Sequence, residues 1–282
     1  MNDTLFDTAR AAARLIPLPK IYHRLRNLLE QPDYAMADVA VLISHDPAMT
    51  TYFLKLVNSP YNRRRHRIET VSHAVSMLGV RQIHDLVLNA SVFKALEETR
   101  VPRADLARFW EYSVRCAMTA RLMASECRFP DPNPLFTCGL LHAIGQMIMM
   151  DVFPQQATRA KEEALSEGQP LFQAERRILG FDYANLGACL MEDWHLPDRL
   201  ITVTRFHVEP EKTPAYPRET ALIFFISQSV STAIAQRSFD GWADAVHPSL
   251  WQTAGITPEQ CITLEKEAGK QIQETGYHTF LS

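Results

Sequence analysis

The chain has 282 residues, of which 46% are hydrophobic and 22% charged, the balance of an ordinary soluble globular protein. Its formal net charge of −3 gives no support for a general nucleic-acid or anionic-membrane partner. The start, Met1–Thr4, is acidic and polar, unlike a secretory signal, and Cys138–Phe153 is too short and too polar to span a bilayer. We therefore expect a cytoplasmic protein with no membrane segment.

Helix signals begin in the first hundred residues. Asp46 and Pro47 pair an N-cap acceptor with a proline suited to the first helical position, and the apolar residues that follow are spaced for one buried helix face: Phe53, Leu54, Leu56 and Val57. Thr70 can cap a second helix, which we expect to end with Gly79 as a C′ residue. The same period predicts a third helix over Val80–Leu96.

The rest of the chain continues the helical pattern. Start signals predict helices from Pro102, Asn133, Asp182, Pro197, Pro217 and Thr257. The helix from Asn133 is expected to run through Gly145, and the last helix, which opens with the capping box Thr257–Gln260, to about Glu274. No segment shows the alternation of a strand bounded by hairpin signals, so we predict an all-α protein.

A polar segment, Glu97–Asp105, contains a proline and separates the two halves of the chain. We take it as the boundary between an N-terminal helical bundle, residues 1–100, and a C-terminal bundle with a helical extension, residues 101–282.

The five cysteines form no C-x-x-C pair, and most lie in apolar helical patterns: Cys116, Cys127, Cys138, Cys189 and Cys261. We expect small buried side chains in a reducing compartment rather than disulfides or a zinc site.

Three motifs of the N-terminal half occur in register, namely Asp46-Pro47, Leu54–Ser59 (Leu-Lys-Leu-Val-Asn-Ser) and Ala74–Gly79 (Ala-Val-Ser-Met-Leu-Gly). Their order and spacing resemble the HDOD family, the HD-related output domains of bacterial signalling proteins. With later motifs, the resemblance covers roughly residues 12–236. It implies an all-α fold of two packed helical bundles, of which the C-terminal one is HD-domain-like.

The segment Gly139–Gly145 (Gly-Leu-Leu-His-Ala-Ile-Gly) resembles the central motif of the HD phosphohydrolase superfamily, in which a His-Asp doublet grips a catalytic metal. Here alanine replaces the aspartate, and its methyl group has no lone pair for a cation. The resemblance places the degenerate metal-site positions at Tyr112, His142, Ala143, Tyr183, His207, Val208 and, in a looser alignment, Gln228.

Of the superfamily's metal ligands, only His142 and His207 remain. Hydrolytic metal sites usually need at least three protein ligands and an open position for water. Both tyrosines could fill the emptied space and hydrogen-bond to the histidines. We therefore expect no catalytic residues and no cofactor. The alternative is a divalent metal on His142 and His207, completed by substitute carboxylates from Asp151, Glu175 or Asp182.

Two functions of different classes follow. The first is a non-catalytic signal-transduction or regulatory module of HDOD type, which binds a signalling protein or a small ligand supplied in trans. The second is a metal-dependent phosphohydrolase of the HD superfamily that acts on a nucleotide or a phosphodiester. The degraded ligand set favours the first, and the sequence leaves the partner and the oligomeric state open.

The densest basic cluster of the chain is Arg63-Arg64-Arg65-His66-Arg67. A solvated loop explains it most simply. The functional alternative is contact with an acidic partner or a phosphate through Arg63, Arg64, Arg65 and Arg67. One nearby aromatic residue, Tyr61, does not make a nucleic-acid site, and we predict none.

Overall fold

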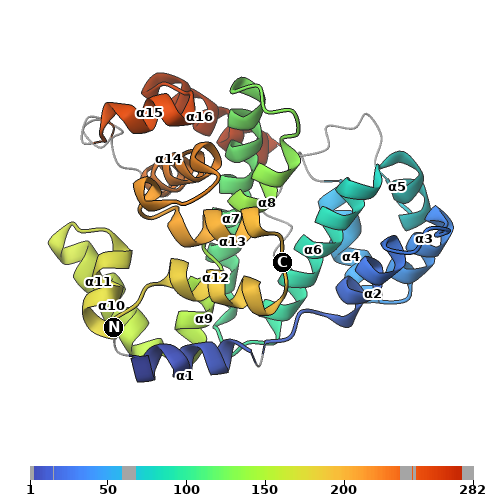
Figure 1. The fold of residues 1–282 in the computed structure, drawn as a ribbon, viewed down its shortest axis with the longest axis horizontal. Coiled ribbons are helices and arrows are strands. Elements are labelled where there is room, and N and C mark those ends of the chain that lie inside the picture. Colours follow the sequence, from blue (N-terminus) through green and yellow to red (C-terminus); the bar gives the residue numbers. More distant parts are fainter. Residues whose placement is uncertain (1–2, 15, 59–67, 236–242, 244–245, 275–282) are drawn as a thin grey trace. The chain divides into compact units, whose positions relative to one another are not determined.

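The computed structural model describes residues 3–14, 16–58, 68–235, 243 and 246–274. Within these ranges the regular elements are helices and no strand is found, which confirms the predicted all-α class (Figure 1). The chain divides into two compact units. One takes in residues 1–16 and 100–269, and the other takes in residues 17–99 with those after Gly269.

Among its described residues, the unit that spans residues 17–99 contains the helices α2 (Lys20–Leu29), α3 (Met36–Ser44), α4 (Pro47–Val57), α5 (Val71–Met77) and α6 (Val80–Glu97). Two predicted N-caps are confirmed, since the Asp46 side chain accepts the Met49 amide at 3.1 Å and Thr70 accepts the His73 amide at 3.2 Å. Gly79 follows Leu78, the C-cap of α5, and so stands at the predicted C′ position, but without the left-handed conformation that is usual there. It has φ −72° and is the N-cap of α6, because the tight turn uses extended backbone at Leu78 and Gly79.

The predicted buried face of α4 is confirmed, since Phe53, Leu56 and Val57 are buried in the core of this unit. The Asn58 side chain closes the end of the helix. Its Nδ2 donates to the Ile68 carbonyl at 2.7 Å, and its Oδ1 accepts the Ile68 amide at 2.7 Å. The side-chain amide of Asn58 therefore bonds to both the amide and the carbonyl of the Ile68 backbone, an interaction that the sequence motif did not reveal.

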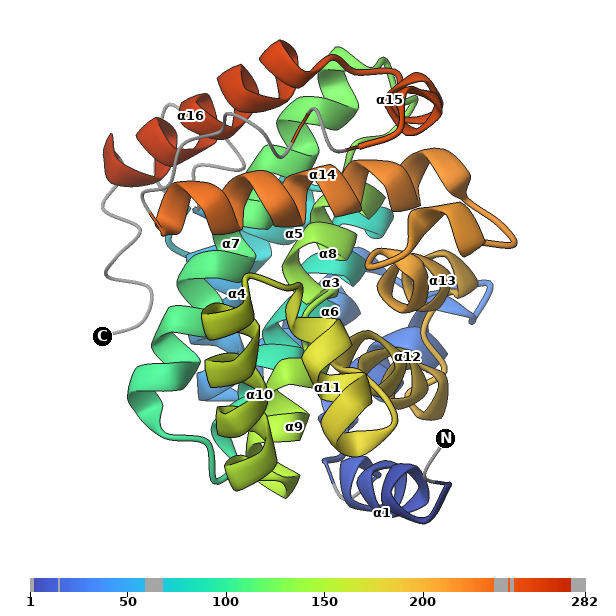
Figure 2. The same ribbon diagram turned by 90° about the vertical axis from the view of Figure 1, so that its left-hand side faces the viewer.

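The other unit contains the remaining helices: α1 (Asp3–Ala13), α7 (Arg103–Glu126), α8 (Asn133–Leu141), α9 (Gly145–Val152), α10 (Pro154–Glu167), α11 (Leu171–Leu179), α12 (Tyr183–Asp193), α13 (Asp198–Phe206), the short 3₁₀ helix η2 (Pro210–Lys212), α14 (Pro217–Ile234), α15 (Pro248–Ala254) and α16 (Pro258–Glu274). α7 packs against both α8 and α14, and Figure 2 shows α14 lying across α7. The capping box at Thr257 and Gln260 is confirmed by reciprocal bonds of 3.2 and 3.0 Å.

The first sixteen residues differ from the predicted division at residue 100. α1 packs against α9 and α12 of the second half, so it does not belong to an N-terminal bundle of residues 1–100. The ring of Phe6 meets Phe181 edge-on with centroids 5.2 Å apart, and Arg14 donates to Asp193 at 3.1 Å. These partners lie far along the chain, so local sequence patterns cannot reveal them.

The helix predicted from Asn133 through Gly145 ends earlier, at Leu141, and a turn over residues 142–144 leads into α9. By length and composition, the 20 residues Asn133–Val152 are long and apolar enough to cross a membrane, and this stretch is longer than the Cys138–Phe153 that we expected to be too short. Most of the stretch is buried inside the protein, as expected for a core segment. The five cysteines are buried free thiols, as predicted.

Candidate functional site

His142 is placed by the end of α8. The helix stops at Leu141, and the Nδ1 atom of His142 lies 2.9 Å from the Gly139 carbonyl oxygen. A carbonyl oxygen can only accept a hydrogen bond, so Nδ1 carries the imidazole proton. The Nε2 atom of His142 is then left with a lone pair that can accept.

The hydroxyl of Tyr112, on α7, donates a hydrogen bond to that lone pair. This hydroxyl lies 3.1 Å from Nε2 of His142 and 3.0 Å from Oγ of Ser227 on α14. Since the one tyrosine proton goes to the imidazole, the Ser227 hydroxyl donates to the tyrosine oxygen. A glycine allows α7 and α8 to approach this closely, because a Cβ at Gly139 would lie 2.8 Å from the Cys116 carbonyl oxygen.

The same arrangement recurs at His207. The side chain of Asp182 caps α12, as predicted, by accepting the Asn185 amide at 2.8 Å, and this makes Tyr183 the first residue of the helix. The Tyr183 hydroxyl lies 2.9 Å from Nε2 of His207, whose Nδ1 lies 2.7 Å from the Thr204 carbonyl oxygen. Tyr183 is therefore the donor and His207 the acceptor. Both predicted tyrosine–histidine contacts are formed.

The two pairs meet in the interior of the unit. The rings of His142 and His207 are edge-to-face with centroids 4.8 Å apart, and both residues are at most 1% exposed. Burial lowers the pKa of His142 to about 3, with a contribution from the neighbouring His207, and burial lowers the pKa of His207 to about 4. Burial also raises the pKa values of Tyr112 and Tyr183 well above 10. All four groups are therefore neutral at physiological pH. We call them the Tyr–His cluster.

These residues do not fit the metal that the HD superfamily binds. Both Nε2 lone pairs accept tyrosine hydrogen bonds, and burial keeps the phenols protonated, which removes them as anionic ligands. Across the described part of the chain, no group of three or more His, Cys, Asp or Glu side chains is placed to hold a metal ion.

The other predicted positions contribute less to the cluster. Ala143 is buried and offers only its methyl group, while Val208 and Gln228 are half-buried. The α14 residue that reaches Tyr112 is Ser227, one position before the Gln228 that we aligned with the late aspartate. A helix turns 100° per residue, so a shift of one position selects a different face.

The three substitute carboxylates all have other partners. Asp151 accepts the backbone amide of Arg100 at 2.7 Å, and the buried Glu175 accepts the Tyr183 amide at 2.9 Å. Asp182 caps α12. The geometry therefore gives no support to the alternative of a metal completed by these residues.

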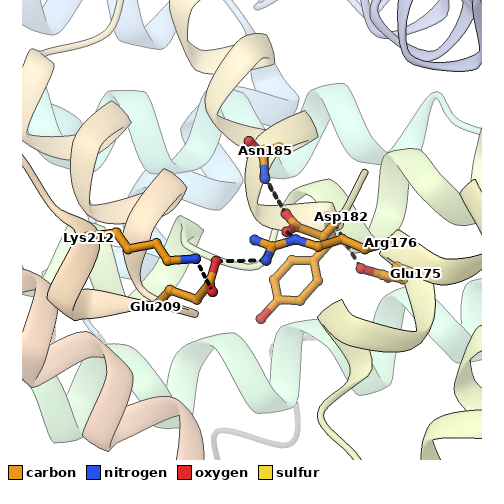
Figure 3. A network of polar contacts seen from close by, with 7 residues as sticks. Glu175, Arg176, Asp182, Asn185, Glu209 and Lys212 are labelled. Atoms are coloured by element: carbon orange, nitrogen blue, oxygen red, sulfur yellow. Dashed lines mark hydrogen bonds and ion pairs between the residues drawn. The ribbon is translucent and has the colours of Figure 1, made fainter. Parts of the chain in front are cut away.

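A charged network lies around the start of α12 (Figure 3). Arg176 donates to Asp182 at 2.6 Å and to Glu209 at 2.7 Å, and Glu209 also accepts Lys212 at 2.5 Å. The amide side chain of Asn185 donates to Asp182 at 2.8 Å. The network ties α11 to the first turn of α12 and to the segment after His207, so it fixes the backbone that carries the second tyrosine–histidine pair.

The arginine cluster predicted as a partner contact, Arg63, Arg64, Arg65 and Arg67, lies outside the described residues.

A helical unit that holds the buried Tyr–His cluster, joined to a smaller helical unit, defines the class of protein as an all-α fold of two units. The HDOD domain family model matches residues 15–210, well over half of the chain. The chain belongs to the HDOD family.

Known structures agree with this assignment. A protein of Shewanella amazonensis named "Putative phosphohydrolase" is 25% identical, with a TM-score of 0.73 over 96% of this chain and 97% of that one. An HDOD domain protein of unknown function from Geobacter sulfurreducens is 21% identical, with a TM-score of 0.74 over 98% and 97%. A "Putative signal transduction protein" of Marinobacter aquaeolei is 19% identical, with a TM-score of 0.73 over 99% and 66%. The last two similarities concern the fold alone.

A sequence relative in Treponema pallidum, an uncharacterized protein, is 27% identical over 206 residues. The match covers 71% of this chain and 39% of the relative, so this chain corresponds to only part of that longer protein.

Proposed function

We propose that this HDOD protein is a non-catalytic signal-transduction module that binds a signalling protein or a small ligand supplied in trans. The observation that carries the proposal is the Tyr–His cluster. In it, Tyr112 and Tyr183, which the resemblance aligns with two metal-ligand positions, donate to His142 and His207. The HD-like centre is thus filled by the protein's own side chains.

The cluster favours a structural role over a catalytic one. General acid–base catalysis at neutral pH is most efficient when the catalytic pKa lies near the working pH. The pKa values of His142 and His207, lowered to about 3 and 4, lie far below it, and the rings are buried. Without a metal-bound water, nothing in the cluster supplies a nucleophile for a phosphodiester.

The proposal is tested by metal content and hydrolysis measured on the full chain. We expect elemental analysis after mild desalting to find no stoichiometric Fe, Mn, Zn or Mg. With Mn²⁺, Mg²⁺ or Fe²⁺ added, we expect hydrolysis of cyclic dinucleotides, nucleotides and a generic phosphodiester to stay at background. The matched control is the double variant His142→Ala/His207→Ala, which should give the same background.

The phosphohydrolase alternative predicts a different result. About one or two metals per chain, together with turnover that the double histidine variant abolishes, would establish metal-dependent hydrolysis and end the non-catalytic proposal. The similarity to the Shewanella amazonensis protein named "Putative phosphohydrolase" is the reason for testing this alternative.

The basic cluster at residues 63–67 remains part of the proposal as a contact for an acidic partner. Complementary charges on two partners accelerate association, and salt screens their effect over about 8–10 Å at physiological ionic strength. Replacing Arg63, Arg64 and Arg65 together by glutamine should slow association with a co-purifying partner at low salt. An unchanged association rate would remove the cluster from the mechanism.

A further inference from the structure

The two helices that leave the Tyr–His cluster end at two of the three places where the chain crosses between the units. α9 begins three residues after His142, and α12 begins with Tyr183 itself. The first crossing lies between Ile16 and Pro17, and the second between Thr99 and Arg100. Each crossing is bound by a residue at the far end of one of these helices.

At the second crossing, the backbone amide of Arg100 donates to Oδ1 of Asp151, in the last turn of α9, at 2.7 Å. At the first crossing, the indole of Trp194, the residue that ends α12, donates to the carbonyl oxygen of Ile16 at 3.0 Å in a buried position. Both contacts lie within the unit that holds the cluster, and each involves a backbone group of the crossing chain.

Arg10, in the last turn of α1, and Arg14, just after its end, add contacts close to the first crossing. Arg14 donates to Asp193 through Nε at 3.1 Å and Nη2 at 3.3 Å, and Arg10 lies 3.7 Å from the same carboxylate. The end of α12 therefore binds the chain just before the crossing as well as at it.

At the cluster, the two helices are in backbone contact. A Cβ on Gly145, the first residue of α9, would lie 1.9 Å from the Tyr183 carbonyl oxygen and 2.8 Å from the Gly187 amide nitrogen. No side chain separates the starts of α9 and α12, so a displacement of Tyr183 must displace Gly145. Helices of 8 and 11 residues then extend about 12 and 16 Å from this contact.

We infer that the Tyr–His cluster and the two crossings form one coupled element, in which the state of the cluster determines how firmly α9 and α12 hold the chain at Ile16 and Arg100. In the closed state, both tyrosine–histidine bonds are made and both crossings are bound. A ligand or partner that breaks a tyrosine–histidine bond loosens both crossings. This inference rests on the proposed signalling function and gives it a route from the cluster to residues 17–99.

The test breaks one bond in the cluster and reads both crossings by NMR on the full chain. Tyr183→Phe removes the hydroxyl that donates to His207 and keeps the ring. We expect hydrogen exchange of the Arg100 amide and the Trp194 indole to rise at least about fivefold, the low end of ordinary coupling between sites. The Gln260 amide, which is bonded to Thr257 elsewhere in the same unit, should keep its rate.

A matched control exists in the other unit. The Tyr22 hydroxyl lies 3.1 Å from Nε2 of His84, so Tyr22→Phe deletes the same chemical group from the same kind of pair. It should leave exchange at Arg100 and Trp194 unchanged. If Tyr183→Phe does not fold, Tyr112→Phe removes the hydroxyl that donates to His142 instead, and exchange at both crossings should rise in the same way.

Coupling between two sites is reciprocal, which provides a second arm. Asp151→Ala removes the acceptor for the Arg100 amide and should shift the imidazole ¹⁵N signals of His207. The inference is overturned if Tyr183→Phe changes the His207 signals while both crossings keep their exchange rates. It is also overturned if the exchange rate of the Gln260 control amide rises together with the rates at both crossings, since that outcome reports general destabilisation. The NMR measurements do not depend on metal content or hydrolysis. Failure of this inference can therefore be distinguished from failure of the proposed function.

Discussion

Glu175 and His207 are linked through one residue, Tyr183. Oε2 of Glu175 accepts the Tyr183 backbone amide at 2.9 Å, and the Tyr183 hydroxyl lies 2.9 Å from Nε2 of His207. Glu175 is 2% exposed. Burial, with a contribution from the nearby Asp182 charge, raises the pKa of this carboxyl to about 8. The first turn of α12 thus lies between a buried acid that titrates near neutral pH and a histidine that stays neutral.

The first prediction concerns stability between pH 6.5 and 8. A carboxyl whose pKa is raised in the folded state favours folding when it is protonated, and this contribution is lost as the pH rises towards 8. The two buried histidines oppose part of this loss near pH 6.5, where their unfolded forms are half protonated. We expect the wild-type free energy of unfolding to fall by on the order of 1 kcal/mol from pH 6.5 to 8.

The variant Glu175→Gln isolates the effect. The carboxamide oxygen can still accept the Tyr183 amide, but the group no longer titrates. Urea unfolding at several pH values should show that the variant lacks the fall in stability that the wild type shows between pH 6.5 and 8. Parallel profiles would mean that Glu175 is not the titrating group.

The second prediction concerns acid. His142 and His207 have folded pKa values lowered to about 3 and 4, so their contribution to stability is present above pH 6.5 and is lost as the pH falls. From pH 6.5 to 5, each should cost about 1–2 kcal/mol. Glu175 opposes this change, because its protonation favours folding over the same range. The measurement therefore belongs in the Glu175→Gln background.

In that background, His207→Gln should reduce the loss of unfolding free energy between pH 6.5 and 5 by roughly half. The control is His45→Gln, because His45 is exposed and lies in the other unit. An acid profile that responds equally to both substitutions would contradict the assignment to the buried histidines.

The sequence predicted the parts of the site that depend on local chemistry. Asp182 was recognised as a cap, and the tyrosines at positions 112 and 183 were expected to bond to the surviving histidines, because a phenol matches the hydrogen-bonding capacity of an imidazole. The role of Ser227 depends on which face of α14 meets α7. That face follows from the tertiary packing of a helix that is apolar on most sides.

Two errors in the fold have the same kind of cause. α1 was assigned to the N-terminal bundle because it is adjacent in sequence, although its partners Phe181 and Asp193 lie far along the chain. The break after Leu141 has no proline or capping signal. The new helix, α9, starts at Gly145, where the backbone closely contacts α12. No pattern within the segment can predict this contact.

The third prediction tests the core of the smaller unit. Leu56 is 1% exposed, so Leu56→Ala should cost on the order of 2–5 kcal/mol of unfolding free energy through lost burial and the cavity left behind. Leu165 is 70% exposed, and the same substitution there should cost under about 0.5 kcal/mol. Urea denaturation measures both. Equal losses at the two positions would show that the buried face of α4 is wrong.

The fourth prediction concerns the contact between α9 and α12. Gly145→Ala places a methyl group 1.9 Å from a backbone oxygen, and backbone cannot move aside as a flexible side chain can. We expect a loss of about 3 kcal/mol or more in unfolding free energy, at or above the usual range for overpacking, with altered His207 imidazole signals. Gly79→Ala is the matched control, since nothing lies within 4 Å of a Cβ there and φ is −72°, so it should cost about 1 kcal/mol at most. A Gly145→Ala protein as stable as the Gly79→Ala protein would mean that the two helices can separate at the cluster, and the backbone contact would no longer support coupling between the cluster and the crossings.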